Sequence, residues 1–317
     1  LLNEFGVKQA RTMADIMGEV VDNQTPDRGI RFGFPAIDEH MRLEPGTVTI
    51  IGARPGMGKT AFMLSSAWRQ AQLGHRPYIV EMEMKSRNLA TRLACGENGI
   101  PVWKAKRRKM DAQDLEALAS WHVAQGDVTA RMIVDETPSM KVSALAARLD
   151  RAKRRENIDM VWIDYIGLLQ PSEKQRPGYD RMTAISNELR VLSKEMDLPF
   201  AVLAQLSRPQ KGAAVSPPKL TDLRDSGEIE QDAEAVCFLH RPKYYDDSSD
   251  DTVQFIRAKN RDGADGMDEL MFDGPGVRML DKNAFPGTVP AYDTRAGLPS
   301  PDNRTEPRKD ADDVAPF

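Results

Sequence analysis

The sequence predicts an α/β fold in which a mostly parallel, twisted β-sheet is flanked by helices. Short apolar segments alternate with segments of helical apolar spacing along most of the chain, which is typical of parallel strands joined by helices. A glycine-rich loop that ends in Gly-Lys-Thr lies between an apolar segment and a helical one. The chain has 317 residues, 40% of them hydrophobic, so its length suggests about two domains or one large one, with a sizeable core.

The composition excludes several classes of protein. No apolar run approaches the ~18 residues that a membrane-spanning helix needs, so we expect no membrane partner. The first residues, LLNEFGVKQAR, lack the basic and apolar regions of a signal peptide. Cys95 and Cys237 are too few for a disulfide scaffold or a cysteine-rich zinc site. Because the net charge is −4, any nucleic-acid contact must come from local basic loops.

The first predicted element is an amphipathic helix over residues 8–24. Its apolar residues have the i, i+3, i+4, i+7, i+8 spacing of one helical face: Met13, Ile16, Met17, Val20 and Val21. This face either packs on the chain's own core or docks on a neighbouring subunit, and the residues leave both alternatives open.

The remaining elements follow from apolar spacing, helix caps and breaker residues. Strands are predicted over residues 48–51, 77–82, 131–134, 159–164, 199–205, 235–240 and 252–258. Helices are predicted over residues 58–73, 86–97, 111–125, 143–155 and 179–196. Loops are predicted over residues 171–178, 207–220 and 243–251. Pro, Asp, Gly, Arg and Asn dominate from about residue 283, which predicts a disordered tail.

The glycine-rich loop predicts a phosphate site. It matches the P-loop pattern G-x-x-x-x-G-K-[ST], with an alanine in place of the first glycine, over Ala53, Arg54, Pro55, Gly56, Met57, Gly58, Lys59 and Thr60. In such a loop, backbone N–H groups and a helix N-terminus surround the phosphates of a nucleotide. Lys59 would reach the β- and γ-phosphates and Thr60 would hold Mg²⁺, so ATP and Mg²⁺ are the expected cofactors.

Carboxylates at the ends of two predicted strands are candidates for the chemistry. Asp164 follows the apolar run Met160–Ile163, and we expect it to complete the Mg²⁺ shell; an N-cap after a core strand is the alternative. Glu81 and Glu83 alternate onto one face at the end of the strand over residues 77–82. Glu83 lies nearer the strand end and is the better candidate for positioning the attacking water.

The motifs taken together resemble those of the DnaB-type replicative helicases, which are hexameric, RecA-like motors. The resemblance covers residues 28–281 and rests on GARPGMGKTAF, EMEM, WIDYIGLLQ, LAQLSRP, DLRDSGEIEQDAEAVCFLHRPKYY and IRAKNRDG. The string DLRDSGEIEQDAE is the most specific of these, because P-loops occur in thousands of proteins. The resemblance implies a RecA-like motor domain over residues 28–282. It implies a subunit-linking helix and connection over residues 1–27, and residues 283–317 form the tail.

The resemblance implies a role for each matching residue of the nucleotide site. Glu83 occupies the position of the catalytic glutamate of the family's S-L-E-M motif, although Glu81 and Met82 replace Ser-Leu. Gln205 matches the glutamine that senses the γ-phosphate. Lys259 and Arg261 match the A-K-x-R pattern that reaches into the neighbouring subunit's ATP site. A surface strand with solvated charges is the alternative for this last pair.

DNA contacts in this family come from loops that face the ring channel. Arg224, Asp225 and Gly227 match its R-E-x-G string, with Asp225 in place of the usual glutamate. Such contacts bind phosphates and carry no sequence information, which suits a motor that moves along any sequence. The neighbouring loops supply three lesser candidates, for which solvated loop charges are an equal alternative: Arg176, Lys211 and Lys219.

The expected function is that of an ATP-dependent replicative helicase. The resemblance implies a homo-hexameric ring that moves 5′ to 3′ on single-stranded DNA and unwinds the replication fork, in the cytoplasm of a bacterial or phage-infected cell and associated with the nucleoid. The family's amino-terminal, primase-docking domain has no counterpart in this sequence. The alternatives are a RecA/RadA- or KaiC-like ATPase, or a non-catalytic protein that binds single-stranded DNA or loads a helicase.

The end of the chain suggests a further partner. Asp310, Asp312 and Asp313 precede a terminal Pro316-Phe317, and this pattern resembles the acidic tips of bacterial single-stranded-DNA-binding proteins. The Phe317 ring would fill an apolar pocket while the acidic residues face a basic surface. The tail therefore either docks on a replication partner, such as a primase, helicase loader or polymerase, or serves only to solubilise the chain.

Overall fold

The computed structural model describes residues 12–14, 17–18, 28–173, 181–207, 216–245 and 250–282, and it describes residues 224–228 by their backbone alone. The chain divides into two compact units, and the larger one contains all of the described residues from Arg28 onward. In the smaller unit, residues 13–14 and 17–18 are helical. The rest of the predicted helix over residues 8–24 lies outside the described residues, as does the tail over residues 283–317.

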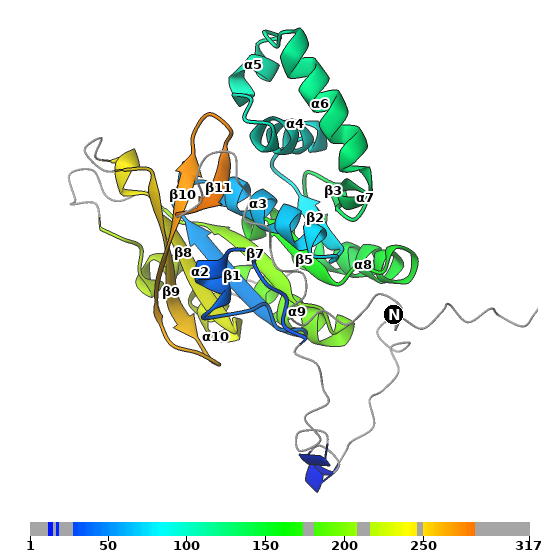
Figure 1. The fold of residues 1–317 in the computed structure, drawn as a ribbon. Coiled ribbons are helices and arrows are strands. Elements are labelled where there is room, and N and C mark those ends of the chain that lie inside the picture. Colours follow the sequence, from blue (N-terminus) through cyan, green and yellow to red (C-terminus); the bar gives the residue numbers. More distant parts are fainter. Residues whose placement is uncertain are drawn as a thin grey trace, which may run out of the picture. The chain divides into compact units, whose positions relative to one another are not determined.

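A β-sheet runs through the larger unit (Figure 1). Within the described ranges it has nine strands in the order β11-β10-β9-β8-β1-β7-β5-β2-β3. The strands from β8 to β3 pair in parallel, which confirms the predicted, mostly parallel sheet. These strands are β1 (Val48–Ala53), β2 (Pro77–Glu81), β3 (Ile133–Glu136), β5 (Met160–Asp164), β7 (Phe200–Gln205) and β8 (Ala235–His240). Two short strands, β4 (Met140–Lys141) and β6 (Leu169–Gln170), pair separately.

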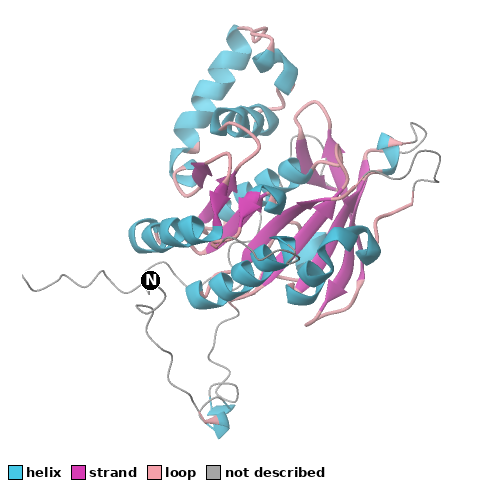
Figure 2. Ribbon diagram, turned by 180° about the vertical axis from the view of Figure 1, so that it is seen from behind, coloured by secondary structure: helices cyan, strands magenta, loops and turns pink. Residues whose placement is uncertain are grey.

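Helices cover both faces of the parallel strands (Figures 1 and 2). One core cluster contains Leu149 and Leu189 from helices on one face, and the other contains Phe62 from a helix on the opposite face. Strands β1, β5 and β8 are buried along their whole length, as expected for strands covered on both sides. The helices outside the excursion described below are α2 (Pro35–Asp38), α3 (Lys59–Gln72), α8 (Val142–Glu156), α9 (Arg181–Met196) and α10 (Gly227–Asp232).

A three-stranded antiparallel extension of the sheet follows β8. It consists of β9 (Thr252–Asn260), β10 (Gly266–Asp273) and β11 (Arg278–Asp281). The sequence analysis predicted only the first of these strands, because acidic residues interrupt the apolar pattern of the other two. Two of these acidic residues form buried ion pairs: Asp268 of β10 pairs with Arg257 of β9, and Asp281 of β11 pairs with Arg69 of α3. Strand β10 is therefore tied to β9, and β11 is anchored on α3, the helix that follows the glycine-rich loop.

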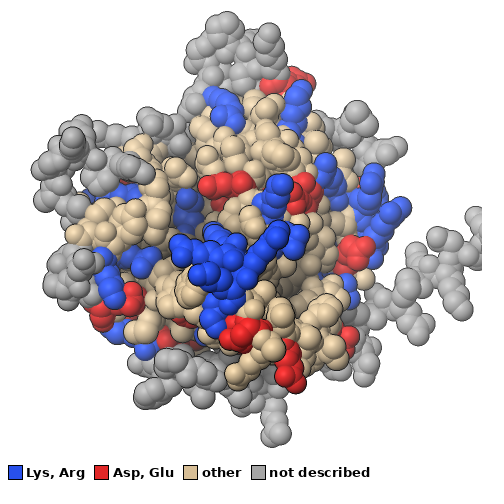
Figure 3. Space-filling model, turned by 90° about the horizontal axis from the view of Figure 1, so that it is seen from above, with Lys and Arg blue, Asp and Glu red and all other residues tan. Residues whose placement is uncertain are grey.

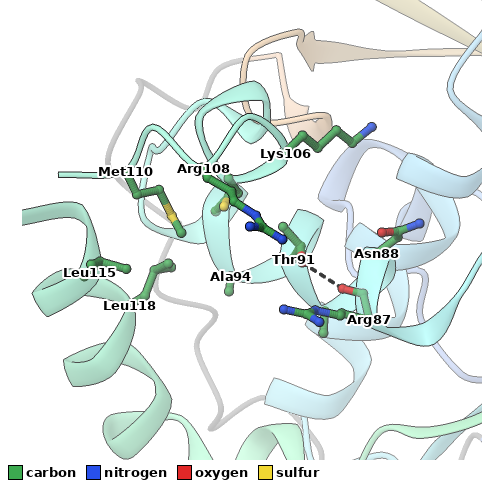
Figure 4. A pocket seen from close by; sticks show the side chains of 12 residues that line it. Arg87, Asn88, Thr91, Ala94, Lys106, Arg108, Met110, Leu115 and Leu118 are labelled. Carbon is green, nitrogen blue, oxygen red and sulfur yellow. Dashed lines mark hydrogen bonds between the residues drawn. The ribbon is translucent and has the colours of Figure 1, made fainter.

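Four helices form an excursion between β2 and β3 (Figures 1 and 2). They are α4 (Ser86–Glu97), α5 (Val102–Lys106), α6 (Ala112–Ala124) and α7 (Gly126–Thr129). Five of the six residues over 104–109 are Lys or Arg. Figure 3, which views the molecule of Figure 1 from above, shows Lys and Arg side chains gathered on this face. A cavity of about 700 Å³ lies between α4, α5 and α6. Its lining combines basic Arg87, Lys106 and Arg108 with apolar Leu115 and Leu118 (Figure 4).

Several predicted boundaries shift in the structure. The strand predicted over residues 131–134 is β3, which begins at Ile133, because the short helix α7 and a following turn precede it. The predicted loop over residues 207–220 runs into a 3₁₀ helix, η2 (Leu220–Ser226), and the loop over residues 243–251 overlaps η3 (Pro242–Tyr244). Another 3₁₀ helix, η1 (Ile166–Leu168), follows β5. Among the helices in the described ranges, none is both long and apolar enough to cross a membrane.

Candidate functional site

The glycine-rich loop lies where a parallel sheet most often binds ligands. Strand β1 ends at Ala53 and α3 begins at Lys59, so the loop occupies the carboxyl end of a central strand and the N-terminus of a helix. Gly56 and Gly58 have φ angles of +83° and +95°, which other residues adopt only with strain. A Cβ atom on Gly58 would also lie 2.7 Å from the side chain of Met279 in β11. Both glycines are therefore required by the backbone.

The departure at Ala53 is compatible with the loop. Ala53 is the last residue of β1, pairs with Gln205 of β7 and Leu239 of β8, and is fully buried. It is not among the non-glycine residues with positive φ. Since the strand ends in an ordinary extended backbone at this position, an alanine fits where the P-loop pattern has glycine.

A hydroxyl and a carboxylate meet beside the loop. The Thr60 hydroxyl, in the first turn of α3, donates a hydrogen bond of 2.6 Å to Oδ2 of Asp164. Asp164 ends β5 and is fully buried, and its Oδ1 atom has no hydrogen-bond partner within the described part of the chain. Burial raises the pKa of Asp164, whereas the Thr60 hydroxyl and the Lys59 charge lower it. Hydroxyl and carboxylate oxygens with free acceptor capacity are the ligands that Mg²⁺ prefers, so these residues fit a Mg²⁺ ion.

Lys59 is the cation of this group. Burial lowers its pKa, while the charges of Asp164 and Glu83 raise it. Its Nζ atom lies 5.7 Å from the centre of the Tyr165 ring, which follows Asp164. The predicted residues Lys59, Asp164 and Glu83 therefore lie close enough to interact electrostatically, at the carboxyl ends of β1, β5 and β2.

The two glutamates at the end of β2 and just after it lie in different environments. The strand ends at Glu81, so Glu83 lies in the bend that follows, and the predicted alternation of both residues on one strand face is wrong. Glu83 is exposed, whereas Glu81 is fully buried. Burial and the neighbouring Asp164 charge raise the pKa of Glu81 to about 7. Glu83, as an exposed carboxylate beside the loop, is therefore accessible to bulk water and to a nucleotide.

Gln205 is exposed at the end of β7 and adjoins the loop. Its backbone is in register with Ala53, and the next residue, Leu206, donates a backbone hydrogen bond of 2.9 Å to the Ala53 carbonyl. The predicted sensing glutamine is thus one strand away from the first residue of the phosphate loop.

Lys259 and Arg261 both reach the carboxyl end of α10. The Lys259 ammonium donates to the carbonyls of Glu230 and Ala233 at 2.5 and 2.7 Å, and Arg261 donates to the carbonyl of Gln231 at 2.6 Å. Burial and the nearby Arg261 charge lower the pKa of Lys259. About half of the Arg261 side chain is exposed. The two cations therefore lie together at one end of a short helix, with Arg261 at the surface.

The predicted DNA-contacting residues are only partly described. The backbone of Arg224 and Asp225 belongs to η2, and Gly227 begins α10, but the side chains over residues 224–228 lie outside the description. Lys219 is exposed, and its backbone N–H donates to Asp222 at 3.2 Å. Arg176 and Lys211 fall outside the described residues. The motif thus forms a 3₁₀ helix followed by the first turn of an α-helix.

One side chain of the phosphate loop contacts this motif directly. Arg54 is buried, donates to the Ser216 carbonyl at 2.8 Å, and pairs with Asp222 at 3.4 Å. The sequence analysis counted Arg54 only as part of the P-loop and missed this link, since nothing in the spacing relates residues that are 168 positions apart. Arg92 of α4 was also missed; it is electrostatically coupled to Glu81, Glu83 and Asp164, and burial lowers its pKa.

Comparison with known proteins identifies the family. Residues 29–281 match the family model of the DnaB-like helicase C terminal domain. The replicative DNA helicase DnaB of Geobacillus stearothermophilus is 33% identical over 250 residues, which are 77% of this chain and 54% of that protein. The DnaB helicase of Treponema pallidum is 33% identical over 264 residues, which are 82% of this chain and 58% of that protein. This chain thus spans just over half the length of these relatives.

Solved structures agree with this assignment. One solved ATPase domain superposes with a TM-score of 0.76 at 28% identity, covering 84% of this chain and 96% of that domain. A DnaB-like replicative helicase, solved in a study of its interactions with primase, gives a TM-score of 0.74 at 28% identity, over 86% of this chain and 67% of that one. The chain therefore belongs to the DnaB-like helicases and contains their RecA-like, carboxyl-terminal ATPase domain.

Proposed function

We propose that this chain hydrolyses ATP with Mg²⁺ to drive a homo-hexameric replicative helicase 5′ to 3′ along single-stranded DNA, unwinding the duplex ahead. One observation carries the proposal: the Thr60 hydroxyl bonds Asp164 beside the glycine-rich loop, where the charges of Asp164 and Glu83 act on Lys59. Family membership supports it, because the relatives that match are named replicative DNA helicases.

The residues of the site divide the chemistry among them. The backbone of residues 53–60 and the Lys59 ammonium would hold the phosphates, while Thr60 and Asp164 would hold Mg²⁺, which neutralises phosphate charge when bound. The exposed Glu83 carboxylate would orient a water for attack and accept its proton. Gln205, one strand from Ala53, would report the presence of the γ-phosphate to the loop that follows it.

Lys259 and Arg261 would act across a subunit boundary. About half of the Arg261 side chain is exposed, and its partners among the described residues are one carbonyl and a distant Glu234 carboxylate 4.0 Å away. An arginine that reaches a neighbouring phosphate in other phosphoryl-transfer enzymes is worth about 10³-fold or more in rate. Residues 1–27 would link subunits in the ring, around the motor domain over residues 28–282.

The DNA would run past the segment that begins at Lys219. Arg224, Asp225 and Gly227 would bind successive phosphates, with Arg176, Lys211 and Lys219 as lesser contacts. The protein would act in the cytoplasm at the bacterial or phage replication fork. The tail over residues 283–317 would dock on a replication partner, such as a primase, loader or polymerase, through Phe317. Equal binding of such proteins with and without Pro316 and Phe317 would leave the tail as a solubilising segment.

Forked duplexes test the proposal directly. We expect ATP- and Mg²⁺-dependent unwinding of a fork whose loading strand has a free 5′ tail, and none when only a 3′ tail is available. Unwinding from the 3′ tail alone would overturn the direction. ATP turnover with strand exchange but no unwinding would favour a RecA/RadA-like recombinase. DNA binding without any ATP turnover would favour a non-catalytic binding or loading protein.

A further inference from the structure

Glu81 has an unusual position for a carboxylate. It is the last residue of β2, its Cα is paired in register with that of Asp164 in β5, and both side chains are fully buried. The family motif places a serine at this position, so the carboxylate is a departure of this chain. A buried charge without compensation is costly, so the contacts of the two carboxylate oxygens decide what the residue does.

The Oε1 atom of Glu81 fixes the turn that carries Glu83. It accepts the backbone N–H of Glu83 at 2.9 Å and that of Met84 at 2.6 Å. These bonds close the bend after β2 and set the direction in which the Glu83 side chain leaves the backbone. A serine hydroxyl can make the same kind of local bond to the following N–H groups, so this contact replaces what the family motif supplies.

The Oε2 atom of Glu81 has no hydrogen-bond partner within the described residues, and neither has Oδ1 of Asp164. Both atoms are buried, and they belong to paired residues at the ends of adjacent strands. An unsatisfied buried acceptor costs about 1–3 kcal/mol. Two such acceptors on residues paired in register, one of them on the carboxylate that Thr60 bonds, indicate a place for donors that the described residues do not provide.

We propose that Glu81 is a positioning residue of the nucleotide site: Oε1 holds the Glu83 turn, and Oε2 accepts a hydrogen bond from water bound to the divalent cation that Thr60 and Asp164 would hold. This inference rests on the proposed function and adds a carboxylate to its metal site. Outer-shell partners of this kind typically change metal affinity or activity by 10–100-fold.

Three substitutions at Glu81 separate its two contacts. Glu81→Gln keeps an acceptor for the turn but removes the carboxylate charge. Glu81→Ser keeps a short acceptor for the turn and loses the reach toward the cation. Glu81→Ala loses both contacts. The matched control is Glu136→Gln: Glu136 is paired in register with Glu81 on β3, but its carboxylate accepts hydrogen bonds from Ser86 instead.

The first measurement needs no turnover. Binding of a fluorescent ADP analogue by the full chain is titrated with MgCl₂. For Glu81→Gln we expect the Mg²⁺ concentration at half-maximal binding to rise about tenfold, with Glu136→Gln within twofold of the unaltered protein. A change within twofold for Glu81→Gln would overturn the metal part of the inference. Absence of Mg²⁺-dependent binding in the unaltered protein would instead overturn the proposed function.

The second measurement separates kcat from KM for ATP. For Glu81→Ala we expect kcat to fall at least tenfold at saturating Mg²⁺, and for Glu81→Ser we expect kcat to recover to within about threefold of the unaltered protein. Equal kcat in the alanine and serine variants would overturn the positioning of Glu83. If the alanine variant does not fold, kcat at saturating Mg²⁺ is compared between the glutamine and serine variants. Because each keeps an acceptor for the turn, the two values should agree within about threefold, and a larger difference would overturn the positioning of Glu83.

Discussion

At the scale of single residues, charged side chains of the candidate nucleotide site, such as Lys59 and Asp164, are partly or fully shielded from bulk water. Lys59 is partly buried at the N-terminus of α3, near Asp164, Glu83 and the Tyr165 ring. Of the two charged P-loop side chains, Lys59 is the one that would reach the phosphates, since the Arg54 guanidinium bonds to Ser216 and Asp222. The other phosphate contacts would be backbone N–H groups, which a side-chain substitution leaves in place.

Lys59→Ala should therefore abolish ATP turnover by removing the fixed cation from the phosphates. Steady-state phosphate release measures this effect. The control is Lys194→Ala, which removes an exposed lysine from α9 and should leave turnover unchanged. Hydrolysis at the unaltered rate in the Lys59 variant would contradict the assignment of the whole site.

Glu83→Gln should retain nucleotide binding and ring assembly while hydrolysis stops, because an amide keeps the shape of the side chain but cannot accept a proton from water. Single-turnover ATP hydrolysis measures the chemical step, analytical ultracentrifugation measures ring assembly, and titration with a fluorescent ADP analogue measures nucleotide binding. A loss smaller than about tenfold, equivalent to ~1.4 kcal/mol of barrier, would assign water activation to another residue, with Glu81 the next candidate.

Glu81 should also make stability depend on pH. Its pKa is raised from 4.5 to about 7, so the folded chain holds this proton more tightly than the unfolded chain. The resulting stability is complete below pH 4.5 and is lost as pH rises through 7, by up to about 3 kcal/mol. Urea unfolding in EDTA at about pH 4 and about pH 8, on either side of this window, should therefore show a smaller loss for Glu81→Gln than for the unaltered protein. Equal losses in both proteins would contradict the raised pKa.

At the scale of elements, the η2–α10 segment joins the nucleotide site to the proposed DNA path. Arg54 of the phosphate loop bonds the Ser216 carbonyl and Asp222, which precede the Arg224 motif. Lys259 and Arg261 bond the carbonyls at the other end of α10. The segment is thus attached to the phosphate loop at one end and, at the other, to the two cations that we propose act on a neighbouring subunit.

Arg224→Ala should weaken binding to single-stranded DNA by a similar factor for all sequences, because a phosphate contact reads no base. The slope of log affinity against log salt should become shallower by about one unit. Fluorescence anisotropy with homopolymeric and mixed oligonucleotides at several salt concentrations measures both effects. An effect confined to particular base sequences would contradict the backbone-contact assignment.

Sequence patterns were sufficient to predict the elements that depend only on residues close together in the chain. The P-loop, the buried strand before Asp164 and the amphipathic α8 and α9 all follow from spacing, because helix and strand periodicity are fixed by backbone geometry. The β10–β11 hairpin could not be predicted, because its acidic residues are compensated across strands and helices, by Arg257 of the paired β9 and by Arg69 of the distant α3. The same reason hides the Arg54–Asp222 pair and the burial of Glu81: each depends on which strands become neighbours.

At the scale of the whole molecule, the proposed ring requires residues of two subunits in each site. Arg261→Ala removes the group that would act on a neighbour, and Lys59→Ala removes one that acts within its own subunit. Mixtures of the two inactive proteins should recover part of the ATPase activity, since some interfaces then combine both intact halves. Absence of recovery at every mixing ratio, with rings confirmed by ultracentrifugation, would place Arg261 in its own subunit's site or outside catalysis.

The β10–β11 hairpin limits how far the chain can be shortened. The Met279 side chain lies against Gly58, and its backbone N–H donates a hydrogen bond to the Ser65 hydroxyl of α3. Asp281 forms an ion pair with Arg69 of the same helix. Cutting the gene before the codon for Gly266 would leave α3 without these supports and would expose the open edge of β9, which invites aggregation. A trimmed protein intended for crystallisation or for a minimal motor should therefore end no earlier than Lys282.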